Sequence, residues 1–394
     1  MNSKIISGIL IVVLVIGCVS EYNVMLPSSD REVLVVDGSI IEDTDVLFYI
    51  SKSFPLNEDI ILNDIFVNDA QLNIIGSDGY ISPSAINQGR GAYQIAVGKL
   101  NDDVEYGLQI EYEGDTYRSA LSKPLYTPEI DSISWIQPDS AGIVSFRVST
   151  HDDAGAARFF SWSYTEDWEI NTVYYTSIFF RPASETFYED FSFPYFYCWR
   201  KNESSKLLLG STESLRENRI INKLLYQRGL ENDHFSLLYS VTVNQKVISK
   251  AAYEYYQNII KLNEGMGGLF TPQPSELTGN ITCITDPSKK VMGYVETAKN
   301  TTQKRIFVYP AQLTHPFIPS NCNSITNDSV RTFLQKNDLT YVYFYQRGYR
   351  PAGGADRTFY PQIVPIEWAP STCTDCTARG GTKNKPDFWP NDHQ

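Results

Sequence analysis

The most chemically suggestive spacing in the sequence is a pair of cysteines separated by two residues, Cys373-Thr-Asp-Cys376. Such a pair can be a thiol redox centre, half of a zinc site or part of a disulfide framework. A redox pair normally begins a helix, but Gly380-Gly381 and Pro386 follow here and disfavour one. A zinc site needs two further ligands, and the sequence has neither a second such pair nor two closely spaced histidines. We therefore interpret the motif as structural disulfide chemistry.

No other local pattern predicts a catalytic, cofactor or metal site. The acidic clusters at 101–103, 151–153 and 57–70 lack the regular alternation and central glycine of a calcium loop, so we interpret them as solvated turns. The sequence has no nucleophile elbow or phosphate-binding loop, and the glycines at 265–268 follow a predicted helix instead of opening one. The histidines occur in no metal-binding spacing, and we interpret each as locally satisfied. They are His151, His234, His315 and His393.

The N-terminus predicts export and lipid anchoring. Lys4 precedes an apolar stretch at 5–16, which is shorter than the roughly 20 residues that span a bilayer and is typical of a secretory signal peptide. The stretch ends in Val-Ile-Gly-Cys18, which resembles the lipobox where a peptidase cuts before a cysteine that carries diacylglycerol. We predict a signal peptide at 1–17, lipidation of Cys18 and a tether at 18–30. Because two or three acyl chains hold a protein stably on a bilayer, the mature chain is expected to sit on the membrane without crossing it.

Export also bears on the remaining cysteines. An oxidising compartment favours pairing, but five cysteines remain when Cys18 is set aside, so one must stay free. The sequence does not select the partners. The five are Cys198, Cys283, Cys322, Cys373 and Cys376.

Composition excludes some classes of partner. A formal net charge of −13 repels phosphate backbones, so nucleic acid is not expected as a partner. A hydrophobic content of 42% excludes wholesale disorder, and 394 residues suffice for two or three domains. Aromatic residues gather in runs at 159–164 and 193–199. Because these runs place aromatics on both faces, we favour buried strands over ligand platforms.

The elements that carry these residues are predicted to be mainly β. Short alternating segments separated by Asp, Gly and Asn turns favour an immunoglobulin-like β-sandwich at 31–127, with a hairpin turn at 113–115. Pro124 and Pro128 predict a connector to a second, larger β-rich region at 128–394. That region contains one clear amphipathic helix at about 249–264, which begins at the good N-cap Ser249 and ends near a glycine.

Several segments together resemble one family of Bacteroidota lipoproteins, catalogued as domain of unknown function 4249. The most specific are the helix with its proline-rich exit at 253–281 and the closing segment with its Cys-x-x-Cys, Gly-Gly and Phe-Trp pairs. The others are "VLVVDGSI" (33–40), "YGLQIEYEGDTYRS" (106–119), "PEIDSISW" (128–135) and "GYVETA" (293–298). The resemblance implies an outer-membrane lipoprotein with an immunoglobulin-like first domain, commonly encoded beside TonB-dependent receptors. It implies no catalytic residues.

The resemblance also suggests how the C-terminal tail is held. Gly380 and Gly381 permit backbone conformations closed to other residues, and Phe388 and Trp389 can fill an apolar groove. We expect a docked tail, stapled by Cys373 or Cys376. If the partner is Cys198, the closed loop exceeds 170 residues, and loop entropy alone suggests at most about 4 to 5 kcal/mol.

The function expected from the sequence is therefore that of a non-enzymatic outer-membrane lipoprotein. Its partners would be the lipid bilayer, through acylated Cys18, and a TonB-dependent nutrient transporter that it assists or supplies with a captured ligand. Ser20-Glu21 resembles the acidic signal of surface-exposed lipoproteins, although the face of the membrane stays open. The alternatives are an adhesive or structural surface module, and a hydrolase of polysaccharide or peptide whose paired carboxylates meet only in space.

Overall fold

The computed structural model describes residues 33–53, 65–138, 142–265, 277, 279–314, 322–358 and 363–390. In this part of the chain the protein is mainly β, as predicted, with several sheets and few helices. The predicted signal peptide at 1–17, Cys18 and the tether at 18–30 lie outside the described residues. We distinguish an N-terminal sandwich (33–126 with 279–299), a central sandwich (127–172 with 197–249 and 300–314) and a distal module (173–196 with 322–375).

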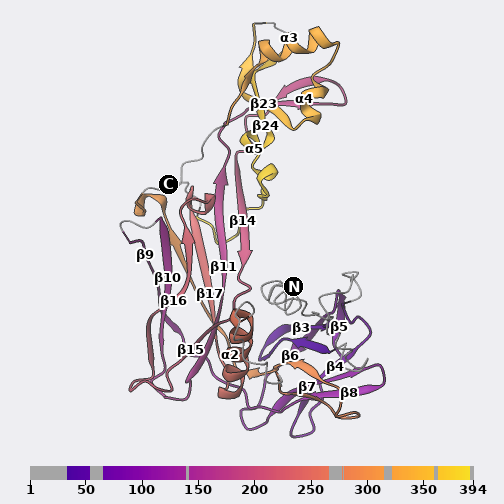
Figure 1. Ribbon diagram of the computed structural model, residues 1–394, viewed down its shortest axis with the longest axis vertical. Helices are drawn as coiled ribbons and strands as arrows, with labels where there is room; N and C mark the ends of the chain where they lie inside the picture. Colours follow the sequence, from indigo (N-terminus) through magenta and orange to yellow (C-terminus); the bar gives the residue numbers. More distant parts are fainter. Residues whose placement is uncertain are drawn as a thin grey trace, which may run out of the picture.

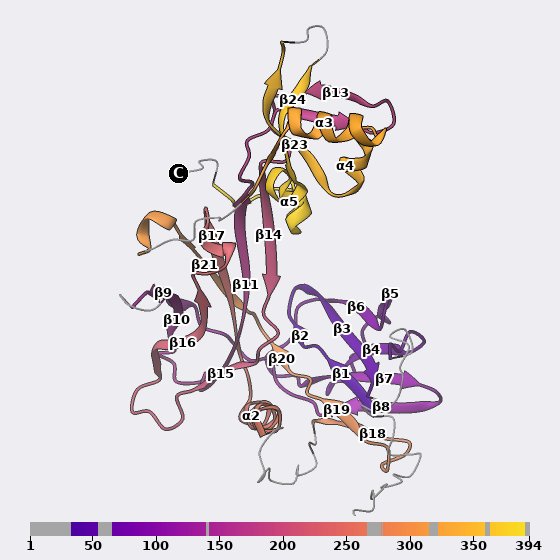
Figure 2. The same cartoon turned by 45° about the horizontal axis from the view of Figure 1, so that its top comes forward.

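The three parts form an elongated molecule. Figure 1 shows the distal module at the top, the central sandwich below it at the left, and the N-terminal sandwich at the lower right. Figure 2 keeps the same arrangement after rotation. The distal module and the N-terminal sandwich are therefore separate regions that the central sandwich connects.

Side-chain alternation builds the N-terminal sandwich. In β3 (Thr44–Lys52), Val46, Phe48 and Ile50 are buried, whereas Leu47 and Tyr49 between them are exposed. Both sheets of this sandwich contribute to one hydrophobic core. The first has the order β19-β1-β3-β6-β5, with β1 (Leu34–Asp37), β5 (Ile86–Gly89), β6 (Ala92–Val97) and β19 (Val291–Gly293). The second has the order β18-β8-β7-β4, with β4 (Gln71–Gly76), β7 (Tyr106–Tyr112), β8 (Asp115–Ser119) and β18 (Ile281–Cys283).

Strands from much later in the chain complete the two sheets. β19 pairs in parallel with β1, β18 pairs with β8, and the short β2 (Ile40–Ile41) pairs with β20 (Thr297–Ala298). Gly293 is needed for this approach, because its φ is +141° and a Cβ there would collide with the carbonyl oxygen of Val36. The range predicted for the first domain, 31–127, thus omits the strands of this sandwich that lie at 281–298. The immunoglobulin-like topology stays a prediction.

The central sandwich packs two antiparallel sheets against each other. Phe146, Phe160 and Tyr239 are fully buried between the sheets. One sheet has the order β16-β10-β9, with β9 (Ile130–Ile136), β10 (Ile143–His151) and β16 (Arg219–Gly229). The other has the order β14-β11-β17-β21, with β11 (Phe159–Asn171), β14 (Tyr197–Glu203), β17 (Tyr239–Val247), β21 (Thr302–Val308) and a side pairing of β15 (Leu208–Ser211) with β11.

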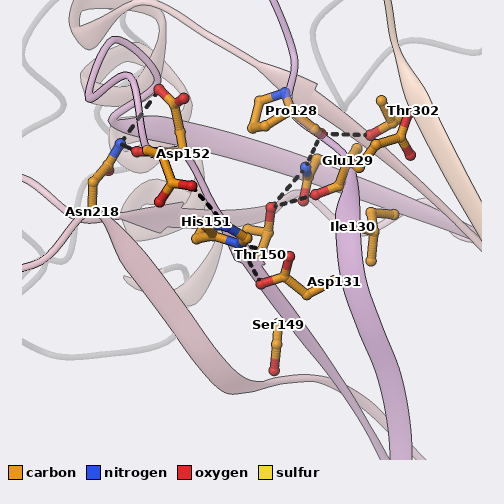
Figure 3. Close-up of polar contacts among 12 residues, drawn as sticks. Pro128, Glu129, Ile130, Asp131, Ser149, Thr150, His151, Asp152, Asn218 and Thr302 are labelled. Carbon is orange, nitrogen blue, oxygen red and sulfur yellow. Dashed lines mark hydrogen bonds and ion pairs between the residues drawn. The ribbon is translucent and has the colours of Figure 1, made fainter.

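Two chain crossings between the sandwiches are tied to each other. The backbone N–H of Thr127 donates to the side-chain carbonyl of Asn300, and the Asn300 amide donates to the carbonyl of Thr127, both at 2.9 Å. One residue further, the carbonyl oxygen of Pro128 accepts from the Thr302 hydroxyl at 3.0 Å (Figure 3) and from the Gln245 amide at 2.8 Å. The predicted connector thus becomes a hydrogen-bonded junction.

The distal module has its own core around Trp368. This side chain is fully buried, and its indole N–H donates to Asn327 at 3.1 Å. Aromatic rings surround it, including Phe180 and Tyr341. The strands are β12 (Ile178–Arg181), β13 (Thr186–Glu189), β22 (Ile325–Thr326), β23 (Tyr349–Asp356) and β24 (Val364–Pro370). The helices are α3 (Asn327–Asn337), α4 (Val342–Gln346) and α5 (Ser371–Thr374).

The predicted helix is confirmed as α2 (Lys250–Gly265). The Ser249 hydroxyl accepts from the backbone N–H of Ala252 at 3.1 Å, which is the bond expected of an N-cap. Ala252 is fully buried against Phe159 of β11, with Tyr256 beside it. Within the residues that the structure describes, no helix has both the length and the apolar character that crossing a membrane requires.

Candidate functional site

The cysteine motif joins two parts of the molecule. Cys376 forms a disulfide with Cys198 of β14, and Cys373 forms one with Cys322 in the distal module. Cys283 is buried and free. Disulfide chemistry is therefore the role of the motif in the structure, with each of its cysteines bonded to a different partner.

Of the two glycines after the motif, Gly380 has the unusual backbone conformation that was predicted, whereas Gly381 is needed for a close approach. Gly380 has a φ of +79° and ends the short 3-10 helix η4 (Cys376–Arg379). A Cβ on Gly381 would lie 2.5 Å from the Cβ of Cys198, so a larger residue there would disturb the disulfide.

In the described residues, the histidines and acidic clusters make local contacts. His151 Nδ1 lies 2.7 Å from Asp131 (Figure 3), and its Nε2 lies 3.6 Å from Asp153. Asp152 accepts from the backbone N–H of Ala157 at 2.7 Å and so closes a turn. No group of three His, Cys, Asp or Glu residues in the described part of the chain is placed to hold a metal ion. His234 stacks on Trp168, whereas His315 and His393 lie outside the described residues.

The most distinctive chemistry lies on β11, whose two faces differ. Every second side chain of this strand is buried on the inner face, toward the core of the central sandwich. These residues are Phe160, Trp162, Tyr164, Glu166 and Trp168. The residues between them are Ser161, Ser163, Thr165 and Asp167, and these line a groove on the outer face of the sheet. The aromatic run therefore alternates instead of covering both faces, with Phe159 as an exception that packs on α2.

On the inner face, Glu166 is the centre of a saturated polar network. Its carboxylate is fully buried and accepts two hydrogen bonds from the Arg228 guanidinium, one of them 2.7 Å long. It also accepts from Asn202 at 2.9 Å and from the Tyr239 hydroxyl, which in turn bonds the Tyr226 hydroxyl at 2.8 Å. Burial raises the pKa of both tyrosines well above its usual value, so both stay protonated. This network holds the sheets together.

On the outer face, two adjoining pockets form the groove. The first has a volume of about 400 Å³, lies near the N-terminal sandwich, and is lined by Asp37, Lys206, Lys246 and Tyr256 as well as the β11 serines. The second has a volume of about 390 Å³. Both pockets include Asn244 of β17 in their lining, so they adjoin there, and we call the two together the groove. Each volume is within the usual range of about 300–1,000 Å³ for ligand pockets.

Asp167 distinguishes the second pocket. It is only 5% exposed, and within the described ranges no hydrogen bond or ion pair reaches its carboxylate. Burial raises the pKa of Asp167, while the nearby charges of Lys201 and Arg305 oppose the rise. The Asp167 oxygens are not among the buried side-chain atoms that lack a hydrogen bond, so they open into the pocket and can accept hydrogen bonds from a ligand there.

The C-terminal tail forms one wall of the second pocket. Thr382 and Trp199 exchange two backbone hydrogen bonds of 2.8 Å each. The Arg305 guanidinium lies 3.2 Å from the ring centre of Phe388 and donates to the Thr242 hydroxyl at 2.7 Å. Trp389 is buried, as the expected docking of the tail requires.

The sequence did not indicate this groove, because its residues come from strands far apart in the chain. The one local signal was the run Ser-Trp-Ser-Tyr-Thr-Glu-Asp at 161–167, where small polar residues alternate with large ones. The groove can exchange hydrogen bonds with a polar ligand, since hydroxyl, amide and charged groups line it.

Comparison with known proteins gives a family. The family model described as "Domain of unknown function (DUF4249)" matches residues 19–304. This range covers the N-terminal sandwich, most of the central sandwich and the start of the distal module. A separate comparison of the sequence with curated proteins finds no match.

Proposed function

The chain belongs to the DUF4249 family, and on that premise we propose that it is a non-enzymatic, lipid-anchored capture protein of the outer membrane. In this proposal it assists a TonB-dependent nutrient transporter, and the groove on the outer face of the central sheet holds the ligand. Acylated Cys18 would attach the chain to the bilayer, and the residues up to Val33 would connect that anchor to the N-terminal sandwich.

The observation that carries the proposal is Asp167 in the groove. The residue is 5% exposed, but its carboxylate oxygens are not among the buried atoms that lack a hydrogen bond, so they open into the second pocket. Burial raises the pKa of Asp167, and a ligand that donates hydrogen bonds to this carboxylate would stabilise its charged form. The disulfide between Cys198 and Cys376 supports the tail that lines the same pocket.

The experiment that tests this function begins with native outer membranes. The full-length chain is extracted in mild detergent, captured through an affinity tag, and its companions are identified by mass spectrometry. A channel-sized TonB-dependent receptor in near-equal amount is the expected result. The protein alone would contradict the accessory role and favour the adhesive or hydrolytic alternatives.

A matched pair of variants tests the anchor. Cys18→Ala removes the predicted acylation site, and the variant should move from the membrane fraction to the soluble fraction. Cys283→Ala removes the cysteine that is free in the described part of the chain, and this variant should stay in the membrane fraction. Membrane retention of the Cys18→Ala variant would contradict anchoring through this residue.

A further inference from the structure

The second pocket of the groove has an excess of positive charge. Its lining contains three cationic side chains and one carboxylate, which are Arg200, Lys201, Arg305 and Asp167. Arg200 has an acidic partner outside the lining, Asp233 at 3.3 Å, and Lys201 has another, Glu203 at 2.6 Å. Asp233 is shared with Arg379 at 2.7 Å, so cations remain in excess when these ion-pair partners are counted. The pocket therefore favours a ligand with net negative charge.

Arg305 is the cation best placed to bind an anion. Its Nε donates to the Thr242 hydroxyl at 2.7 Å, and its guanidinium lies 3.2 Å from the ring centre of Phe388, so the group is held in place. In the described part of the chain no carboxylate lies within ion-pair distance of it, and its two terminal nitrogens have no hydrogen-bond partner. Neighbouring N–H groups of a guanidinium match two oxygens of a carboxylate or phosphate. Arg305 therefore presents a pair of donors to an oxyanion in the pocket.

Strand register places Arg305 and Asp167 on either side of a floor of hydroxyl groups. Thr165 of β11, Thr242 of β17 and Arg305 of β21 lie in one row across the sheet. Asp167 is two residues further along β11, so its side chain is on the same face, and Lys201 of β14 lies directly opposite it. A ligand over the two threonines can therefore contact the guanidinium at one end and the carboxylate at the other.

Asp167 determines which groups suit the other end of the ligand. An ionised carboxylate accepts hydrogen bonds but does not donate them, so it favours donors on the ligand. An ammonium donor would add to the positive excess of the lining, whereas hydroxyl groups donate without charge. The amides of Asn244 and Gln303 in the same lining both donate and accept, as hydroxyl groups do.

Resting on the proposed function, we propose that the second pocket binds a small hydroxylated oxyanion, which carries one carboxylate or phosphate group and several hydroxyl groups. The terminal nitrogens of Arg305 donate to the oxyanion, and the hydroxyl groups of the ligand donate to Asp167. The volume of about 390 Å³ is within the usual range for small-molecule pockets.

The test uses probes that share one sugar ring and differ in charge. Isothermal titration calorimetry at low ionic strength measures binding of glucose, glucosamine, glucuronate and glucose-6-phosphate to the full-length protein in detergent. Glucuronate, glucose-6-phosphate or both should bind at least about tenfold more tightly than glucose and glucosamine. The tighter of the two identifies the oxyanion as carboxylate or phosphate. Binding of neither anion, or equal or tighter binding of glucose or glucosamine, would overturn the proposal.

Variants of Arg305 then locate the oxyanion. Arg305→Gln should lower the affinity for the bound anion at least about tenfold, because hydrogen bonds to charged groups are the stronger ones. Arg305→Lys keeps the charge but loses the paired donors, so it should lose less. The matched control is Arg118→Gln in the N-terminal sandwich, because the Arg118 Nε also donates to a side chain on a neighbouring strand, Gln109 at 2.8 Å. This control should bind like the parent chain, and unchanged affinity in Arg305→Gln would overturn the assignment.

A variant of Asp167 tests the hydroxyl groups separately. Cyclohexanecarboxylate has a six-membered ring and a carboxylate but no hydroxyl groups, so its affinity relative to glucuronate reports the contacts of the hydroxyls. The parent chain should prefer glucuronate, and Asp167→Asn should reduce that preference about tenfold. An unchanged preference would overturn the role of Asp167.

The two proposals fail separately. A chain that co-purifies with a transporter but binds neither anionic sugar keeps its accessory role and loses this ligand class. A chain that binds an anionic sugar through Arg305 but purifies alone keeps the ligand class and loses the transporter.

Discussion

Glu166 and Asp167 are neighbours on β11, and both are almost completely buried, yet they differ in every contact. Glu166 faces the inside of the central sandwich and accepts hydrogen bonds from Arg228, Asn202 and Tyr239. Asp167 faces the groove and, in the described part of the chain, has no hydrogen-bond partner. Burial of the residue alone therefore does not distinguish these two carboxylates, whereas their hydrogen-bond partners and their access to the groove do.

The same contrast applies to the two faces of the whole sheet. The inner face is closed by aromatic stacking, such as the 3.8 Å separation of the Tyr164 and Tyr226 ring centres. The outer face exposes hydroxyls and amides to a groove. The inner face thus contributes stability, whereas the outer face is the one that we propose for ligand capture, and substitutions on each side should have separable effects.

The largest effect is expected from Glu166→Gln. This change leaves the partly buried Arg228 guanidinium without its carboxylate, and breaking a buried pair typically costs up to about 3–5 kcal/mol. Urea denaturation of the variant measures the loss in the free energy of unfolding. A loss in the free energy of unfolding below about 1 kcal/mol would contradict the structural role that we assign to Glu166 and so remove its contrast with Asp167.

Removal of the disulfide between Cys198 and Cys376 should have the next largest effect. The bond closes a separation of 178 residues, and the double alanine variant should lose about 2–4 kcal/mol in the free energy of unfolding. The tail should also loosen, so Trp389 fluorescence should shift to longer wavelength. The control is Cys322→Ala with Cys373→Ala, which should leave that fluorescence unchanged.

Tyr239→Phe should produce a moderate effect on the inner face. The variant keeps the ring and removes the hydroxyl that joins Glu166 to Tyr226. We expect a loss of about 1–3 kcal/mol, because hydrogen bonds to charged groups are among the stronger ones. Thermal unfolding followed by circular dichroism measures it, and an unchanged midpoint would show that the network tolerates the loss of one member.

The smallest effect on stability is expected from Asp167→Asn. Because burial raises the folded-state pKa of Asp167, the ionised carboxylate opposes folding above that pKa. At neutral pH the variant should therefore be as stable as the parent chain or slightly more stable. As the pH falls through the raised pKa, the parent becomes protonated and this difference should disappear. Denaturation at several pH values measures the difference, and clear destabilisation of the variant at neutral pH would contradict the comparison.

Much of the fold could be predicted from local patterns. The β-rich character, the bounds of α2 within one residue, and the end of the first run of strands near the prolines follow from alternation, capping and turn residues. The disulfide role of the Cys-x-x-Cys motif also followed from its context. These features depend on a few neighbouring residues, which is why one sequence sufficed to indicate them.

The rest depends on contacts between distant segments. The pairing of Cys373 with Cys322, and of Cys376 with Cys198, follows from where the distal module meets β14. The groove likewise needs β11, β17 and β21 side by side before Asp167 and Arg305 face the same space. Cys18 and its lipidation stay a prediction from the sequence, since that residue lies outside the described range.

The late strands of the N-terminal sandwich have a consequence for how the protein is made. β18 and β19 are the outermost strands of their sheets, so they cover β8 and β1. Until residues 281–293 have been synthesised, β1 and β8 each present an unpaired edge, which is a template for aggregation. The N-terminal sandwich therefore leaves the ribosome first, but it cannot complete its two sheets until residues 281–293 have been synthesised. Any fragment that ends before residue 281 should therefore be prone to aggregation, whereas in the full chain β18 and β19 cover both edges.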